Sequence, residues 1–476
     1  MPTFSPHSNK FYLFSFMYWI AVVTSVILWS LNWDTLQAAS SNLEHLFGLF
    51  GFCVFCVLFC FAYFDFRHLS NFSYRNLILI GLPFLISLFF LSLVIEFGQK
   101  SWDYNQYEAA FRSVAIGDNP YLSKHFLYPP PFVSAMVGVY QLGKMVFPLL
   151  QLEMKESMLW NFVFFIHQST LLFFLYWAYY LSIKFSEMIG INKLKGILFI
   201  SGLFLFNVPV LRTISYNQIN FYILVFILLA MLLLSKHPYV SGFAIAAGGL
   251  IKLYPFALIV PLLVTKKWKV LWGIVIGVLG ITIAQTKFFQ ELLLWKQFTL
   301  FYISFPIKGE SSFFRNTSPL GFIRNLFELL GLSAQLVLPI FGILFVGIII
   351  WFMVRFLTRE RIYSFASKQQ MNLFVDKDIF RNIGHLVDFS VLVLLLEPLG
   401  WEHHFVIAIP LTIWVIAAHK KVFSKSAAIG ILLVFLLPVF NIFPLSYLRL
   451  LGLVMLIELC SPRRISNLQI DELSHI

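Results

Sequence analysis

Charged residues are scarce in this sequence. Asp, Glu, Lys and Arg make up 12% of the 476 residues, whereas 59% are hydrophobic and the mean hydropathy is +0.83. No stretch longer than about fifty residues is polar enough to form a soluble domain, and no repeat of fixed period is present. This composition excludes a soluble globular protein, because a globule needs far more polar surface than the chain supplies.

Cysteine is also rare, which excludes a disulfide framework. Three of the four cysteines, Cys53, Cys56 and Cys60, lie in one apolar run. A metal site there would require charged thiolates in hydrocarbon, so we interpret them as small buried hydrophobic residues. The net charge of +12 comes mainly from short loops between apolar runs. Basic residues in such loops fix membrane orientation, so the charge does not indicate nucleic-acid binding.

Long apolar runs recur along the whole chain, each about twenty residues long and therefore able to span a bilayer. They predict an all-α, polytopic transmembrane helical bundle of about 12–14 spans. The first run has no small-residue cleavage pattern after it, so we expect a retained helix and not a removed signal peptide. The predicted spans are 11–31, 46–64, 76–96, 131–149, 159–183, 196–213, 219–235, 239–264, 269–286, 335–357, 384–399, 403–418, 426–440 and 444–459.

The charges between the runs predict the orientation and the regions of the chain. Basic segments at 265–269, 355–381, 419–425 and 461–464 are expected in the cytoplasm, which places 287–334 and 401–404 outside. The segment 239–264 is either one bent span or two short helices broken at Lys252, the second case requiring a re-entrant helix within 131–183. The regions are N-terminal spans 1–96, an outer loop 97–130, core spans 131–286, a second outer loop 287–334, C-terminal spans 335–465 and a polar tail 466–476.

The outer loop contains an unusually polar stretch, "QKSWDYNQYEAAFRSVAIGDNPYLSKHFLYPPPF", over 99–132. It predicts a short interfacial helix from about Tyr104 to Ala115, followed by a turn and a proline run. Asp103 could cap that helix, since Asp is a favoured N-cap residue, or it could act as a general base. Asp118, directly before Asn-Pro, is interpreted as a turn former.

Other polar residues interrupt the apolar runs and are functional candidates for that reason. Cations facing a carboxylate suit a reaction in which the carboxylate takes a proton while the cations hold a departing phosphate. Arg212 and Lys252 could instead extend to the lipid headgroups. The adjacent His403 and His404 would point to opposite sides of a helix, so at most one is expected to face the site. The candidates are Arg212, Gln218, Lys252, Arg315, Asn316, His403 and His404. His167 and Gln168, in mid-span, predict an interhelical hydrogen-bonding pair.

Several ordered segments resemble glycosyltransferase family 87, the integral-membrane enzymes of GT-C architecture that include polyprenyl-phosphate-mannose-dependent alpha-1,2-mannosyltransferases. They cover most of 100–415, and the spans before Asp103 show no such resemblance. Where the family often has glycine before the glutamine of the second segment, this chain has Asn217. The segments are "WDYNQYEAAFRSVAIGDNPY" with "FLYPPPF", "LRTISYNQINFYILVFILLAMLL", "SGFAIAAGGLIKLYPFALIVPLL" before "TKKWK", "RNTSPLGFIRNL" and "GWEHHFVIAIP".

The resemblance implies a GT-C bundle and an inverting transfer of a hexose, most plausibly mannose, from a polyprenyl phosphate to a glycolipid or glycan acceptor. Asp103 matches the position of the family's base. The implied site lies on the extracytoplasmic face of the cell membrane and needs no metal or cofactor. Its donor-phosphate and substrate residues would be Tyr128, Arg212, Gln218, Lys252, Arg315, Asn316, His403 and His404.

Two other classes of function remain open at this point. A transporter or flippase of an anionic lipid-linked sugar would also explain membrane-embedded cations and a broken helix. Such a protein should show internal pseudo-symmetry, which the sequence lacks, and it has little use for an aspartate at the membrane surface. A membrane scaffold without catalytic activity would leave the charged residues scattered, with no convergence.

Overall fold

The computed structural model describes nine segments, and every regular element in them is helical. The predicted spans before residue 99, the three clustered cysteines, Arg315 and the polar tail lie outside the described residues. The described segments are 100–122, 126–151, 155–205, 207–287, 292–304, 316–365, 377–418, 425–437 and 443–462.

Within the described segments, four helices are long and apolar enough to cross a membrane. They are α6 (Pro130–Leu149), α7 (Glu156–Met188), α13 (Trp268–Gln285) and α16 (Val337–Phe365). Predicted spans at 131–149, 159–183, 269–286 and 335–357 coincide with these helices. A fifth span is possible if α8 (Lys193–Leu205) and α9 (Val208–Ser215), bent by 52°, are counted together.

Several of the remaining apolar runs are divided into shorter helices. The described residues therefore contain fewer uninterrupted spans than the sequence analysis predicted for the same segments. A helix of fourteen residues, such as α10 (Asn220–Leu233), is about 21 Å long, against a hydrocarbon thickness of about 30 Å. Other short helices are α18 (Ile409–Ala418), α19 (Lys425–Ile431) and α20 (Leu448–Leu459). Helix α17 (Lys377–Leu396) has 20 residues but is not among the candidate spans. Turns of 3-10 or π type join several of these helices: η3 (Glu402–Ala408), η4 (Leu432–Leu436) and η5 (Leu445–Tyr447).

The segment 239–264 has the break at Lys252. Helix α11 (Pro238–Ile251) ends there, Lys252 is extended at φ −150° and ψ 132°, and η1 (Tyr254–Leu258) with α12 (Ile259–Val264) follows. Pro255, near the start of η1, has no backbone N–H to continue the helical ladder. The two-helix alternative of the sequence analysis therefore describes this segment correctly, and the lysine lies in the gap.

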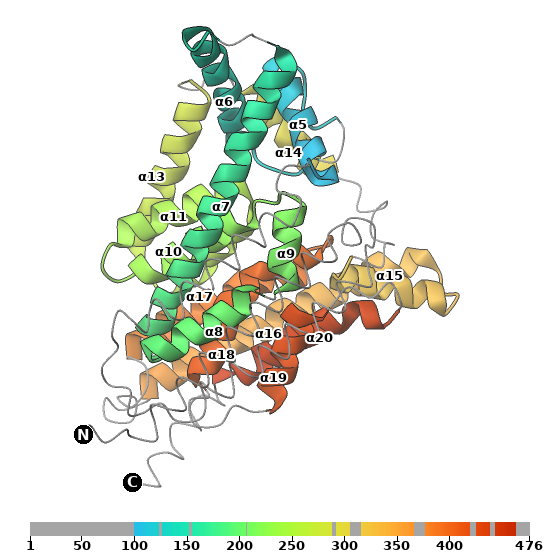
Figure 1. The fold of residues 1–476 in the computed structure, drawn as a ribbon. Helices are drawn as coiled ribbons and strands as arrows, with labels where there is room; N and C mark the ends of the chain where they lie inside the picture. The colour runs from blue at the N-terminus through green and yellow to red at the C-terminus, as the bar shows by residue number, and fades with distance from the viewer. Residues whose placement is uncertain are drawn as a thin grey trace, which may run out of the picture.

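The helices form two groups that meet around this break. Figure 1 shows α6, α7 and α13 upright in the upper half, with α5 (Trp102–Ala115) and α14 (Leu293–Ser304) beside them. Below them α16, α17, α18 and α20 run across the view, with α15 (Pro319–Leu329) at the side. The 3-10 segment η3 packs on α9 and α17, and η1 packs on α11 and α17. Residues from both groups thus come together there.

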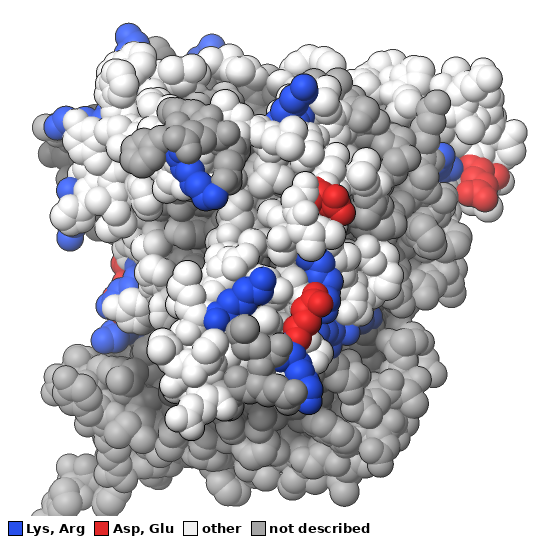
Figure 2. All heavy atoms as spheres, turned by 90° about the horizontal axis from the view of Figure 1, so that it is seen from above, with Lys and Arg blue, Asp and Glu red and all other residues white. Residues whose placement is uncertain are grey.

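The surface of α16 is apolar on one side and holds buried charge on the other. Ile343 and Ile350 are exposed, as expected for a face in contact with lipid. Arg355 and Arg359 are buried and form ion pairs with Asp388 of α17, at 2.7 and 2.9 Å. The prediction of a basic cytoplasmic loop over 355–381 was wrong for these two arginines, because the helix continues through them and a carboxylate of the neighbouring helix binds both. From above, charged side chains are few and lie among uncharged ones (Figure 2).

Close packing of α11 against α13 depends on glycine and provides a test of this fold. A Cβ atom on Gly273 would overlap the backbone carbonyl of Tyr239, whereas one on Gly280 of the same helix would meet nothing within 4 Å. We expect Gly273→Ala to destabilise the protein by about 1–3 kcal/mol, because the helices must separate. Gly280→Ala should leave the thermal unfolding midpoint in detergent unchanged or slightly raised. Equal midpoints for the two variants would contradict this close approach of the two helices.

Candidate active site

Asp103 lies in the first turn of α5, and a different residue caps this helix. The N-cap is Ser101, whose hydroxyl accepts a hydrogen bond from the Tyr104 amide at 3.0 Å. The Ser101 hydroxyl also donates to the Tyr216 carbonyl at 2.7 Å, which ties the start of α5 to the end of α9. The capping interpretation of Asp103 was therefore wrong, since Ser101 satisfies the helix start.

The Asp103 carboxylate is held by a buried hydrogen-bond network. Gln218 donates from Nε2 to Oδ2 of Asp103 at 2.8 Å, and its Oε1 lies 2.7 Å from the Tyr107 hydroxyl and 3.0 Å from the Tyr128 hydroxyl. Burial raises the pKa of both tyrosines above the usual value, so both stay protonated and can donate. The two hydroxyls also lie 2.6 Å apart, so one phenol donates to the other and the remaining phenol proton points at Oε1 of Gln218. A phenol donor at Oε1 leaves the NH₂ group of Gln218 to face Asp103.

The turn before Gln218 has a left-handed backbone conformation at Asn217, for which glycine is normally preferred. Asn217 has φ +54°, in the left-handed region that asparagine tolerates better than most residues. Its side-chain oxygen accepts from the Ser101 amide at 2.9 Å, and its carbonyl contacts Nε2 of His167 at 2.8 Å. Asn217 thus replaces the glycine common in the family without loss of the turn. The His167 contact joins α7 to the turn before α10, as predicted for an interhelical hydrogen bond from this histidine.

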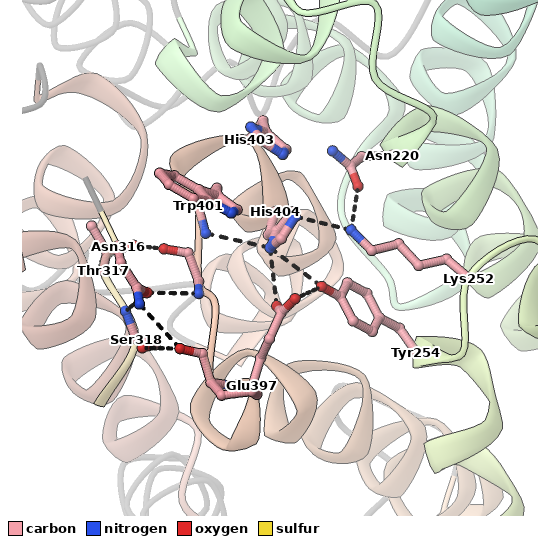
Figure 3. Close-up of polar contacts among 12 residues, drawn as sticks. Asn220, Lys252, Tyr254, Asn316, Thr317, Ser318, Glu397, Trp401, His403 and His404 are labelled. Carbon is pink, nitrogen blue, oxygen red and sulfur yellow. Dashed lines mark hydrogen bonds and ion pairs between the residues drawn. The ribbon is translucent and has the colours of Figure 1, made fainter. Parts of the chain in front are cut away.

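Lys252 contributes an ammonium group from the gap between α11 and η1. Figure 3 shows its Nζ directed toward His404, 2.9 Å from Nε2, with Asn220 Oδ1 at 3.4 Å. The same Nζ lies 4.4 Å from the ring centre of Tyr254 and 6.0 Å from that of Tyr128. Lys252 also interacts electrostatically with the carboxylates of Asp103 and Glu397. Its partners are protein groups, which does not fit the headgroup-contact interpretation.

His404 is held on its other side by a carboxylate that the sequence analysis missed. Its Nδ1 is 3.0 Å from Oε2 of Glu397, and the Tyr254 hydroxyl donates to Oε1 of the same glutamate (Figure 3). Glu397 lies at the end of the predicted span 384–399, in "LLLEPLG". A lone carboxylate directly before proline in an apolar run was a signal that could have identified it.

Arg212 and His403 border the same region. The Arg212 Nε is 3.5 Å from Oε1 of the buried Glu402, and its guanidinium lies 5.1 Å from the ring centre of Tyr216. The rings of His403 and His404 touch edge to face, with centres 4.5 Å apart. The contact between the two rings shows that the histidines do not point to opposite sides, and the ring that bonds Lys252 is that of His404.

The Asn316 side chain binds the loop between Glu397 and His404, and its hydrogen bonds do not include Lys252. Its Oδ1 accepts from the amides of Ser318 at 3.1 Å and Gly400 at 2.9 Å, and its Nδ2 donates to the Pro398 carbonyl at 3.1 Å. Thr317 and Ser318 add hydrogen bonds to Gly400 and Pro398 (Figure 3). Asn316 thereby fixes the chain between Glu397 and His404, and it supports the site from outside.

Comparison with known protein families agrees with this geometry. A family model described as glycosyltransferase family 87 matches residues 126–374, more than half of the chain. The chain belongs to glycosyltransferase family 87. Membership implies a membrane glycosyltransferase, which uses a sugar donor and an acceptor. No curated protein and no solved structure matches the chain.

The match includes only part of the site of this family 87 protein. Tyr128, Gln218 and Lys252 lie within the matched residues, whereas Asp103 precedes them and His404 follows them. The hydrogen bonds described above connect the matched core to both outer segments.

The loop function of Asn316 leads to a stability prediction. Asn316→Ala would leave the buried amides of Gly400 and Ser318 without their partner, at about 1–3 kcal/mol for each unsatisfied group, while the Pro398 carbonyl keeps the Ser318 hydroxyl. We expect a clearly lower thermal unfolding midpoint in detergent. Asn105→Ala, at an exposed position of α5, should change the midpoint little. A normal midpoint for Asn316→Ala would argue against this loop function.

Proposed function

We propose that the protein transfers a hexose, most plausibly mannose, from a polyprenyl phosphate to a glycolipid or glycan acceptor, with inversion at the sugar. The single observation that carries the proposal is the bridge between carboxylate and ammonium. Tyr128 shares Gln218 with Asp103, and the Tyr128 ring lies beside the Lys252 ammonium. Such a displacement requires a base near the attacking hydroxyl and a cation near the departing phosphate, with the anomeric carbon between them.

In the proposed reaction the acceptor hydroxyl attacks the anomeric carbon in one step. Its proton passes to Asp103 as the new carbon–oxygen bond forms. The bond between the anomeric carbon and the phosphate oxygen breaks, and its electron pair stays on the phosphate. The phosphate monoester gains one negative charge, which Lys252, together with Arg212 and His403, would stabilise. A single displacement inverts the anomeric configuration.

The apolar faces beside the site support a lipid-borne donor. Exposed large hydrophobic side chains continue along α13 and α16. A polyprenyl chain could remain in the bilayer there while its phosphate enters between the two helix groups. The GT-C architecture and the extracytoplasmic position of the site belong to this proposal. The extracytoplasmic position follows the orientation predicted from the charged loops, in which 97–130 and 401–404 lie on the outer side.

Asp103→Asn tests the base. The variant keeps the size of the side chain and can still accept the Gln218 hydrogen bond, but it cannot take the proton. We expect normal insertion and a transfer rate reduced about 100-fold or more, measured with purified protein and polyprenyl-phosphate sugar. Asp118→Asn, at an exposed turn, is the matched control and should keep wild-type activity. Near-normal transfer by Asp103→Asn would remove the catalytic assignment of Asp103. Absence of transfer by the wild type, together with vesicle flux of the lipid-linked sugar, would instead favour a transporter.

Lys252→Met tests the cation, since methionine has a similar length and no charge. Loss of one charge-assisted contact to the departing phosphate should remove about 2–4 kcal/mol of transition-state stabilisation. The measurement is kcat/KM for the lipid donor. The control is Lys144→Met, which replaces an exposed lysine of α6 and should have no effect. Unchanged turnover at saturating donor would show that Lys252 does not contact the phosphate during transfer.

A further inference from the structure

Glu397 is a buried carboxylate for which the proposed reaction has no use. It follows the last residue of α17, and its amide donates to the Val393 carbonyl at 2.9 Å. The side chain is 15% exposed and meets two segments, Tyr254 of η1 and His404 of η3. A carboxylate in such surroundings is costly unless it serves a partner, because desolvation disfavours its charge.

The contacts of His404 determine which of its nitrogens carries the proton. Nε2 faces the Lys252 ammonium at 2.9 Å, and an ammonium can only donate, so Nε2 accepts. Nδ1 faces the Glu397 carboxylate at 3.0 Å, which can only accept, so Nδ1 donates. The backbone amide of Trp401 also points at Nδ1, but at 3.4 Å it is the weaker contact. The Tyr254 hydroxyl lies 3.3 Å from Nδ1 but gives its proton to Glu397, so it can only accept there. Two charge-assisted hydrogen bonds outweigh the long amide contact, and the Nδ1–H tautomer follows.

This tautomer makes Lys252 depend on Glu397. With the proton on Nδ1, the Nε2 lone pair holds the ammonium in place, and Asn220 Oδ1 supplies a second, longer contact at 3.4 Å. Glu397 also supplies negative charge near the ammonium. A buried ammonium without such a charge would tend to lose its proton or move away. Lys252 would then be unavailable to a phosphate.

We propose that Glu397 is a positioning residue, which acts through His404 to keep the Lys252 ammonium charged and directed toward the donor phosphate. The inference rests on the proposed function, since it names a residue that prepares the same site. Glu397 itself touches neither the sugar nor the phosphate. Its effect should therefore disappear when Lys252 is replaced.

Glu397→Gln is the primary test, because it keeps the shape and removes the charge. We expect kcat to fall about tenfold to 100-fold, as for loss of a hydrogen bond to a charged group, while the donor KM changes less than about threefold. The split follows because the donor phosphodiester carries one negative charge from the start and gains its second only as the bond breaks, so the ammonium matters most in the transition state. In the Lys252→Met background, Glu397→Gln should cost nothing more. Losses that multiply in the double variant would overturn the proposal, and so would a wild-type kcat for the single variant.

Two controls separate positioning from a general structural effect. Glu458→Gln, at an exposed glutamate bonded to Trp351 on α16, should keep both activity and thermal midpoint. Tyr254→Phe removes one hydrogen bond from Glu397 and leaves the charge, so a smaller loss of about threefold is expected. This loss should also vanish in the Lys252→Met background. If Glu397→Gln does not accumulate in the membrane, the test is Tyr254→Phe in the wild-type and in the Lys252→Met background. Equal losses of kcat in the two backgrounds would overturn the proposal.

Failure of the proposed function would be visible in the wild type, which would then transfer no sugar from any polyprenyl-phosphate donor. Binding of a polyprenyl monophosphate still tests Glu397 in that case. We expect about tenfold weaker binding by Glu397→Gln in the wild-type background and equal binding in the Lys252→Met background. Unchanged or tighter binding by Glu397→Gln would show that the glutamate merely competes with phosphate for the lysine, and would overturn the proposal.

Discussion

The contact between the Lys252 ammonium and His404 joins the two groups of helices, and the other polar residues of the site depend on it. A positive charge among apolar helices is tolerated only when its donors have partners and opposite charge is near. The break after α11 brings the lysine into the gap between the helix groups. Asp103 approaches it from one group and Glu397 from the other. These contacts link segments separated by as many as three hundred residues, which local sequence could not have brought together.

Breaking a helix inside the membrane exposes backbone groups, and the side chains near the site satisfy many of them. Asn316 binds one amide and one carbonyl of the segment that leads to His404, and the Ser318 amide of its own segment. Ser101 and Asn217 do the same where α5 meets the end of α9. Irregular backbone is stable at membrane depth only where the protein itself supplies such partners. The polar residues of this chain thus fall into two kinds, those that allow the breaks and those that the breaks bring together.

Hydrophobic length predicted α6, α7, α13 and α16 correctly, because a long apolar run between polar ends has few alternatives to a helix. The same criterion left the break at Lys252 undecided between two alternatives and missed the interruption at His403. At both places proline, 3-10 turns and tertiary hydrogen bonds compete with the helical ladder. Asp103, Gln218 and Lys252 were candidate site residues from sequence, and the structure joins the first two by a hydrogen bond. Glu397 was overlooked because a single carboxylate inside an apolar run gains significance only when its partner is known.

Two buried charge clusters show what distinguishes a binding site from a structural support. Around Asp388 the partners are strong, since the carboxylate binds Arg355 and Arg359 and Arg355 also donates to the Ile457 carbonyl at 2.9 Å. An incoming anion would have to displace a carboxylate there. Lys252 instead rests on a histidine lone pair, an amide oxygen and aromatic rings, all of them neutral. A phosphate binds an ammonium more strongly than any of these groups, because a charge-assisted hydrogen bond is about twice as strong as a neutral one. Lys252 is therefore stabilised well enough to remain charged before a substrate binds, and weakly enough to exchange its partners for that substrate.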